Sequence, residues 1–194
     1  ASYYRPGHAD YTFDEKYGFR DYRGGGRSSG RETIGRVAAG AIALKLLKEL
    51  GIEICAYTKS IGPVSIDYER FDTDAILSTP TCMPDTVASG QAEAYLEECM
   101  KSLDSSGGVI ECIAKGVPAG VGEPVFDKLD ANLGKAILSI GSVKAFEIGD
   151  GIAVAAMKGS ENNDAFVMKD GQVTKMTNHS GGILGGMSDG SDIV

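Results

Sequence analysis

The chain has 194 residues, of which 42% are hydrophobic and 24% charged, so it is long enough to bury a core as one domain. Its formal net charge of −8 argues against nonspecific binding to nucleic acids or to anionic membrane surfaces, because both need a positive field. The charge is unevenly distributed: residues 1–36 carry seven Lys/Arg against five Asp/Glu, so residues 37–194 carry twelve against twenty-two.

The first 22 residues are rich in tyrosine and in charged side chains and show no clear period. Pro6-Gly7 is a turn signal, which places His8 on a loop. Because histidine titrates near neutrality, His8 could donate a proton to a reaction at a neighbouring anion site. A lone histidine is more often a structural hydrogen-bonding residue, and that alternative stays open at this point.

A glycine-rich segment, residues 23–33 (Arg-Gly-Gly-Gly-Arg-Ser-Ser-Gly-Arg-Glu-Thr), precedes the first long helical pattern. Glycines let a ligand approach the backbone, and the start of a helix offers free N–H groups and the positive end of its dipole. Ser28 and Ser29 add hydroxyl groups, while Arg27 and Arg31 add guanidinium forks that suit phosphate oxygens. We therefore predict an anion-binding site here, called the anion cradle below.

Two alternatives bear on the anion cradle. One is a flexible glycine loop followed by an ordinarily capped helix. The other is a nucleotide site, but the segment matches neither G-x-x-x-x-G-K-[ST] nor a G-x-G-x-x-G fingerprint, so nucleoside triphosphates and nicotinamide cofactors receive little support. Four arginines within a short stretch favour anion binding: Arg20, Arg23, Arg27 and Arg31.

Ser29 and Glu32 have the spacing of a capping box, and the apolar pattern after them predicts a helix from about Gly30 to Leu50 that ends at Gly51. Two strands are expected next, at 52–58 and 64–68, followed by a loop at 72–85. Asp85 is the expected N-cap of a second helix. That helix should bury an apolar face made of Val87, Ala88, Ala92, Tyr95, Leu96, Cys99, Met100 and Leu103.

The second half of the chain predicts a strand at 109–115 and a third helix from about Phe126. Two hairpins should follow, one formed by 143–148 and 152–157 and one around Asp170-Gly171. Residues 177–186 form a second glycine-rich loop, with His179 inside it, so we expect a large ligand or two adjacent ones. Helices that alternate with antiparallel hairpins predict an α+β fold rather than a doubly wound sheet.

The four cysteines have no C-x-x-C spacing: Cys55, Cys82, Cys99 and Cys112. We therefore expect reduced core thiols in a cytoplasmic protein, with no zinc site and no disulfide framework. The longest apolar run, residues 37–47, is too short to span a bilayer, and no signal peptide precedes it. The chain opens on Ala1 rather than on methionine and stops just after a glycine-rich loop, so we expect a portion of a longer protein.

Five segments resemble, in this order, the motifs of the chorismate synthase family: 5–10, 21–33, 122–131, 147–151 and 181–186. The resemblance implies a single core portion, residues 1–194, of an α+β fold in which antiparallel sheets sandwich a layer of helices, assembled as a homotetramer. It also implies a lyase of the shikimate pathway, which eliminates phosphate from 5-enolpyruvylshikimate 3-phosphate to give chorismate. That reaction requires reduced FMN without net redox change; a flavin reductase activity is left open.

The resemblance also implies roles for single residues. His8 corresponds to the family histidine that protonates or stabilises the reduced flavin, and Arg5 and Arg31 correspond to arginines that hold the anionic groups of the substrate. The flavin contacts correspond to Arg27, Ser28, Ser29, Gly141, Ser142 and Gly185. At Gly141-Ser142 the family often has Asn-Ala, so an amide side chain is missing there. No family role is implied for His179, and no metal site.

Some family motifs are absent from these residues: the Gly-Glu-Ser-His-Gly motif with its second catalytic histidine, the Lys-Pro-Thr-Ser-Ser-like segment and a later Arg-x-Asp motif. Two hypotheses therefore stand. One is the enzyme or its core portion. The other is a catalytically incomplete fragment that folds and self-associates but binds anions or flavin weakly. A generic phosphosugar or flavin binder ranks below both, because it would need the anion cradle without the other four motifs.

Overall fold

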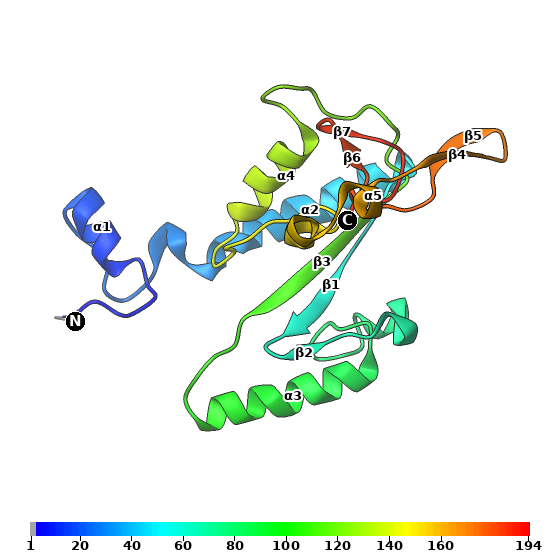
Figure 1. Ribbon diagram of the computed structural model, residues 1–194. Helices are drawn as coiled ribbons and strands as arrows, with labels where there is room; N and C mark the ends of the chain where they lie inside the picture. The colour runs from blue at the N-terminus through cyan, green and yellow to red at the C-terminus, as the bar shows by residue number, and fades with distance from the viewer. Residues whose placement is uncertain (1–2) are drawn as a thin grey trace.

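The computed structural model describes residues 3–194 as a mixed α+β fold (Figure 1). A three-stranded sheet and two smaller two-stranded sheets are all antiparallel, and helices lie between and beside them. The predicted α+β class is confirmed. Within the described residues no helix has both the length and the apolar character needed to cross a membrane.

The N-terminal part of the chain stretches away from the rest of the molecule (Figure 1). It contains α1 (Asp10–Tyr17) and the 3-10 turns η1 (Gly26–Ser28) and η2 (Gly30–Glu32); α2 (Thr33–Glu49) follows and runs through the middle of the molecule. The predicted first helix is confirmed, although its first turn is a 3-10 turn. In place of the predicted capping box, Ser29 Oγ accepts a hydrogen bond from the Arg31 N–H at 3.4 Å. Gly51, with φ 77°, follows the end of the helix.

The main sheet has the strand order β2-β1-β3. Its strands agree with the predicted ones, although β2 is shorter than expected: β1 (Glu53–Ile61), β2 (Val64–Ser65) and β3 (Gly108–Lys115). Tyr57 on β1 lies opposite Glu111 on β3, and its hydroxyl donates to Glu111 Oε1 at 2.5 Å. Lys59 Nζ donates to the other oxygen of that carboxylate at 2.6 Å, so one acid links the two long strands through both oxygens.

The core lies between this sheet and α3 (Thr86–Lys101). It consists of Tyr57, Ile66, Ile76, Met83, Ala88 and Ala92. The predicted apolar face of this helix is only partly confirmed, since Ala88 and Ala92 are buried but Met100 and Leu103 are 65% and 97% exposed. In the C-terminal half of α3, Tyr95, Leu96 and Cys99 are half-buried, while the end of the helix extends beyond the sheet (Figure 1).

The side chain of Asp85 fixes the start of α3, as the sequence predicted. It is fully buried and accepts hydrogen bonds from the Val87 and Ala88 N–H groups at 2.9 and 3.1 Å. Its carboxylate also pairs with the Arg70 guanidinium at 2.7 Å and accepts from the Asp67 N–H at 3.0 Å. Hydrogen bonds from Arg70 and from these main-chain groups hold the pKa of the Asp85 carboxyl well below its usual range.

The C-terminal half contains α4 (Leu129–Leu138), η5 (Gly151–Ala156), α5 (Gly159–Asn162), β4 (Phe166–Lys169), β5 (Gln172–Lys175), β6 (Ile183–Leu184) and β7 (Met187–Ser188). The hairpin around Asp170-Gly171 is confirmed as β4–β5. The third helix begins at Leu129 rather than at Phe126.

The predicted hairpin of residues 143–157 is wrong. Residues 143–150 are irregular, and η5 takes the place of the second strand. The backbone groups that a hairpin would pair are bonded to distant segments instead: the Gly149 N–H donates to Val194 O and the Asp150 N–H to His179 O, both at 2.9 Å. A Cβ at Gly149 would collide with the main chain of the 179–181 loop, so this turn is a packing surface.

A buried ammonium group joins the C-terminal loops. Lys175 has a side chain only 2% exposed, and its Nζ contacts Asp164 at 3.2 Å and Asp189 at 2.7 Å. It also donates to Asn178 Oδ1 at 3.0 Å and to Ser180 Oγ at 2.7 Å. Burial alone would raise the pKa of Asp164, but hydrogen bonds from the Ser180 N–H and other donors hold it well below its usual range.

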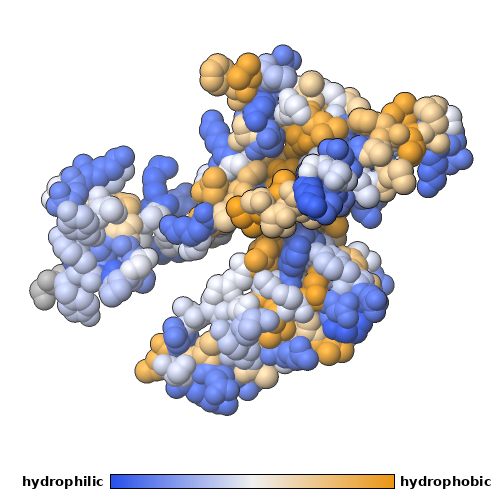
Figure 2. Space-filling model, in the orientation of Figure 1, coloured by the Kyte–Doolittle hydropathy of each residue, from blue (hydrophilic) through white to orange (hydrophobic). Residues whose placement is uncertain are grey.

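Helix α2 is apolar around most of its circumference, yet none of its residues is buried. Ile42 and Leu44, two residues apart and so on opposite sides of the helix, are 73% and 47% exposed. A helix of this kind is normally a core element. Figure 2 shows hydrophobic side chains gathered over the middle of the molecule, near α2 and α4, and over the β4–β5 hairpin.

The four cysteines form no disulfide. Cys82 and Cys112 are exposed, so the expectation of core thiols is wrong for these two, whereas the half-buried Cys55 packs against the core.

We expect Asp85→Ala to lower the free energy of unfolding by about 2–4 kcal/mol, because it removes a helix cap, leaves the buried Ala88 N–H without its acceptor and removes one of the two carboxylates that pair with Arg70. Asp85→Asn should lose less, because the amide oxygen can still cap α3. Since folding lowers the pKa of this group, its contribution is complete above the unfolded pKa of about 4 and is lost as the pH falls below it. Urea unfolding at pH 7 and pH 3 measures both effects; a loss equal to that of the exposed control Asp74→Ala would contradict the assignment.

Lys175→Met should destabilise the chain by about 3–5 kcal/mol, because it leaves two buried carboxylates without a counter-charge. The matched control is Lys169→Met, which removes an exposed lysine from the other strand of the same hairpin. Chemical denaturation followed by circular dichroism measures the difference, and equal stability of the two variants would show that the Lys175 cluster does not hold the loops.

Candidate functional site

The anion cradle forms two consecutive 3-10 turns directly before α2. Gly26, with φ 53°, turns the chain and lies against the ring of Phe13 from α1. Ser28 Oγ donates to Gly25 O at 2.6 Å, and Arg31 Nε donates to Ser29 Oγ at 3.2 Å. These local bonds shape the loop and leave the Ser29 hydroxyl hydrogen available to a ligand.

The four arginines counted in the sequence divide into two pairs. Arg20 pairs with Asp14 at 2.9 Å, and Arg23 pairs with Asp21 at 3.2 Å. Arg27 and Arg31 form no ion pair with another described residue, and both are exposed. The cationic groups of the anion cradle are therefore Arg27 and Arg31, beside the open backbone at Gly30, where no atom lies within 4 Å of a would-be Cβ.

His8 lies on the exposed loop before α1, as predicted. Its Nδ1 is 2.9 Å from Pro6 O, and because a carbonyl can only accept, Nδ1 carries a hydrogen. That bond sets the tautomer and leaves Nε2 for another partner. Arg5, in contrast, is already engaged: its guanidinium pairs with Asp10 at 2.7 Å and lowers the pKa of that carboxyl well below its usual range.

Arg36 is a functional candidate that the sequence reasoning missed. It lies in the first turn of α2, and its Nη2 donates to Ser139 O at 2.9 Å and to Ser139 Oγ at 3.0 Å. This contact brings the turn after α4, with Gly141 and Ser142, next to the start of α2 (Figure 1). The only sequence signal was its place five residues after Arg31.

Gly185 lies elsewhere, in the turn of the β6–β7 hairpin. Its neighbour Gly186 accepts a hydrogen bond from the Leu129 N–H at 2.7 Å, so this hairpin meets the start of α4. Gly141 and Ser142 follow the end of the same helix. Because a ten-residue helix is about 15 Å long, one ligand that touched both would have to span the length of α4.

His179 is held at two points beside this second glycine-rich loop. Its Nδ1 lies 2.6 Å from Asp150 Oδ2, and its main-chain N–H donates to Asp164 at 2.8 Å. Both partners come from outside the loop, so a purely structural role for His179, as a hydrogen-bonding residue, is enough to explain these contacts.

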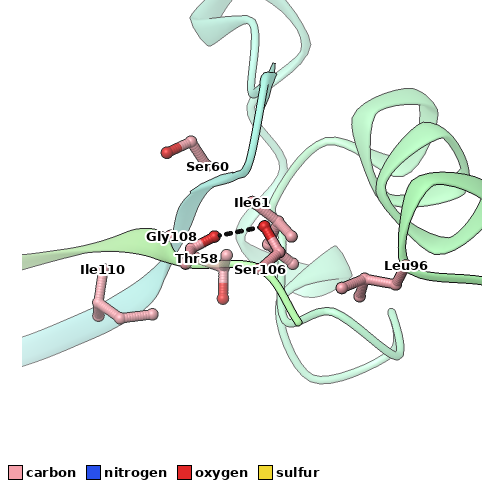
Figure 3. A pocket seen from close by; sticks show the side chains of 8 residues that line it. Thr58, Ser60, Ile61, Leu96, Ser106, Gly108 and Ile110 are labelled. Atoms are coloured by element: carbon pink, nitrogen blue, oxygen red, sulfur yellow. Dashed lines mark hydrogen bonds between the residues drawn. The ribbon is translucent and has the colours of Figure 1, made fainter. Parts of the chain in front are cut away.

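The hollow in Figure 3 is lined by none of the predicted site residues. It measures about 340 Å³ and lies between the end of the main sheet and the segment after α3, lined by Thr58, Ser60, Ile61, Leu96, Ser106, Gly107, Gly108 and Ile110. It has no charged lining residue, so it offers an anionic ligand no guanidinium or ammonium group. Within residues 3–194 no group of three His, Cys, Asp or Glu side chains is placed to hold a metal ion.

The comparisons with known proteins point to one family. The chorismate synthase family model matches residues 1–194. Chorismate synthases from Lachnoclostridium phytofermentans and Agathobacter rectalis are 70% and 66% identical to this chain over its full length, and it covers 53% of each. The chain thus spans about half the length of these curated relatives.

A solved structure titled as a crystal structure of chorismate synthase matches with a TM-score of 0.87 and 30% identity. The match covers 95% of this chain and 60% of that one. Together with the family match over residues 1–194, this agreement in sequence and fold shows that the chain belongs to the chorismate synthase family.

Proposed function

We propose that this chain supplies one part of the active site of a chorismate synthase, which eliminates phosphate from 5-enolpyruvylshikimate 3-phosphate in the presence of reduced FMN. The main support for the proposal is the anion cradle of a chain that belongs to this family: among residues 3–194, Arg27 and Arg31 form no ion pair at the start of α2. Both the substrate and the flavin carry phosphate, and the substrate adds carboxylates.

The residues present fit a phosphorylated flavin. The anion cradle offers two guanidinium groups, hydroxyl groups and open backbone, which is the donor set that phosphate oxygens require. Gly141 has no atom within 4 Å of a would-be Cβ, so a flat ring system can approach the main chain there. When bound, reduced FMN supplies an electron-rich partner for an electron-poor substrate.

The protein groups then have separate tasks. Arg27, Ser28 and Ser29 bind the flavin, and Arg31 binds anionic groups of the substrate and stabilises the departing phosphate. Arg5 can join Arg31 only through the N–H groups that Asp10 does not occupy. His8 holds a proton at Nε2 when it is protonated, with Nδ1 fixed on Pro6 O, and can release it toward the flavin.

This chain is proposed to be a single core portion of the family fold, in a cytoplasmic enzyme that works as a homotetramer. The exposed anion cradle and the uncovered α2 support a site that other segments complete, because arginines stabilise a developing charge best when water is excluded. The alternative is a catalytically incomplete fragment, which the same exposure favours for the chain on its own. A hybrid enzyme, in which this chain replaces the matching segment of the Lachnoclostridium phytofermentans relative, separates the two.

In that hybrid, Arg27→Ala should weaken the binding of FMN by about 1.5–3 kcal/mol, roughly tenfold to 150-fold, because one charge-assisted hydrogen bond to phosphate is lost. Fluorescence titration with FMN measures the effect. Arg23→Ala is the matched control, since that arginine is paired with Asp21. Unchanged affinity in the Arg27 variant would remove the basis for the anion cradle.

His8→Ala in the hybrid should lower the turnover number by about 100-fold or more, with less than a threefold change in FMN affinity, because a proton donor acts on the reaction rather than on binding. An anaerobic chorismate assay with reduced FMN, paired with the same titration, gives both numbers. Equal losses in turnover and affinity would indicate that His8 only supports the loop through Pro6.

A further inference from the structure

Arg36 spans a separation of 103 residues to reach the end of α4. Ser139 is the C-terminal cap of that helix, where the last carbonyl groups have no partner in the helix and the dipole is negative. The guanidinium donates hydrogen bonds to both the main-chain oxygen and the hydroxyl oxygen of Ser139. It therefore provides a donor for the free carbonyl group at the end of α4 and fixes that end against the first turn of α2.

The residues after this contact form an unusual turn. The Val143 N–H donates to Ile140 O at 3.3 Å, which closes a four-residue turn. Its third position is Ser142, with φ 71°, a conformation that such turns normally give to glycine. A non-glycine residue in this region costs conformational free energy and persists only where the surroundings hold it. The glycine of the turn, Gly141, stands one position earlier and is open to solvent.

We propose that Arg36 is a positioning residue: it holds the strained Ile140–Val143 turn beside the anion cradle, so that one flavin can touch both. The inference rests on the proposed function of Gly141, Ser142 and the cradle. Arg36 lies between the two, five residues after Arg31 on one side and in contact with Ser139 on the other. Arg36 acts by holding Ser139 in place, and not by attracting the anionic ligand with its own positive charge.

The first test uses the chain as it is and needs no ligand. Amide hydrogen exchange of the 139–146 segment should be at least tenfold faster in Arg36→Gln than in the wild type, because the end of α4 is released. Arg36→Lys, which can still donate to Ser139, should recover most of the protection. Lys48→Gln removes a charge from the other end of α2 and should change nothing. Unchanged exchange in Arg36→Gln, with α2 itself still protected, would overturn the proposal.

The second test measures FMN binding to the hybrid enzyme. Arg36→Gln should weaken binding at least tenfold, and the difference from the wild type should persist at about 1 M salt, where the attraction between exposed charges is screened. A difference that disappears in salt, or equal affinity of the two proteins, would contradict a positioning role. Failure of the wild-type hybrid to bind FMN would instead count against the proposed function, while the exchange result would still decide the role of Arg36.

Discussion

The organisation of this chain depends on one constraint, a helix that is apolar on most of its sides. Helix α2 carries the anion cradle at its start, contacts β1 and receives the end of α4 through Arg36, yet it buries none of its own residues. An apolar helix gains its stability from packed neighbours on several sides. In this family the chain accounts for about half the length, and we infer that α2 becomes a core element where the rest of that length is present.

The candidate site is likewise only partly formed within this chain. Local hydrogen bonds shape the anion cradle, so its form depends on residues close in sequence, such as Ser28 bonded to Gly25. The Ser142 turn reaches it through one long-range contact, and Gly185 lies at the far end of α4. This arrangement suits an elongated ligand with a charged end in the cradle. The hollow beside α3, which has no charged lining residue, is lined by none of the candidate site residues.

The sequence was informative wherever structure is local. The cap at Asp85, the two long strands and the Asp170-Gly171 hairpin were predicted correctly, because each depends on a residue pattern a few positions long. The hairpin at 143–157 failed for the opposite reason: Gly149 and Asp150 bond to the chain's last residue and to His179, and no local pattern reports such partners. The contact of Arg36 with Ser139 could not be predicted for the same reason, because its partner lies far along the chain. No local pattern marks Lys175 as buried either, because its carboxylate partners, Asp164 and Asp189, come from separate loops.

The central claim is that this chain carries a functional part of a composite site that the rest of the family fold completes. The most direct measurement compares chorismate formation from 5-enolpyruvylshikimate 3-phosphate, under anaerobic conditions with reduced FMN, by the hybrid enzyme and by the chain alone. The account predicts turnover by the hybrid within about tenfold of the parent Lachnoclostridium phytofermentans enzyme, and none by the isolated chain. A hybrid that folds and binds FMN but forms no chorismate would contradict it.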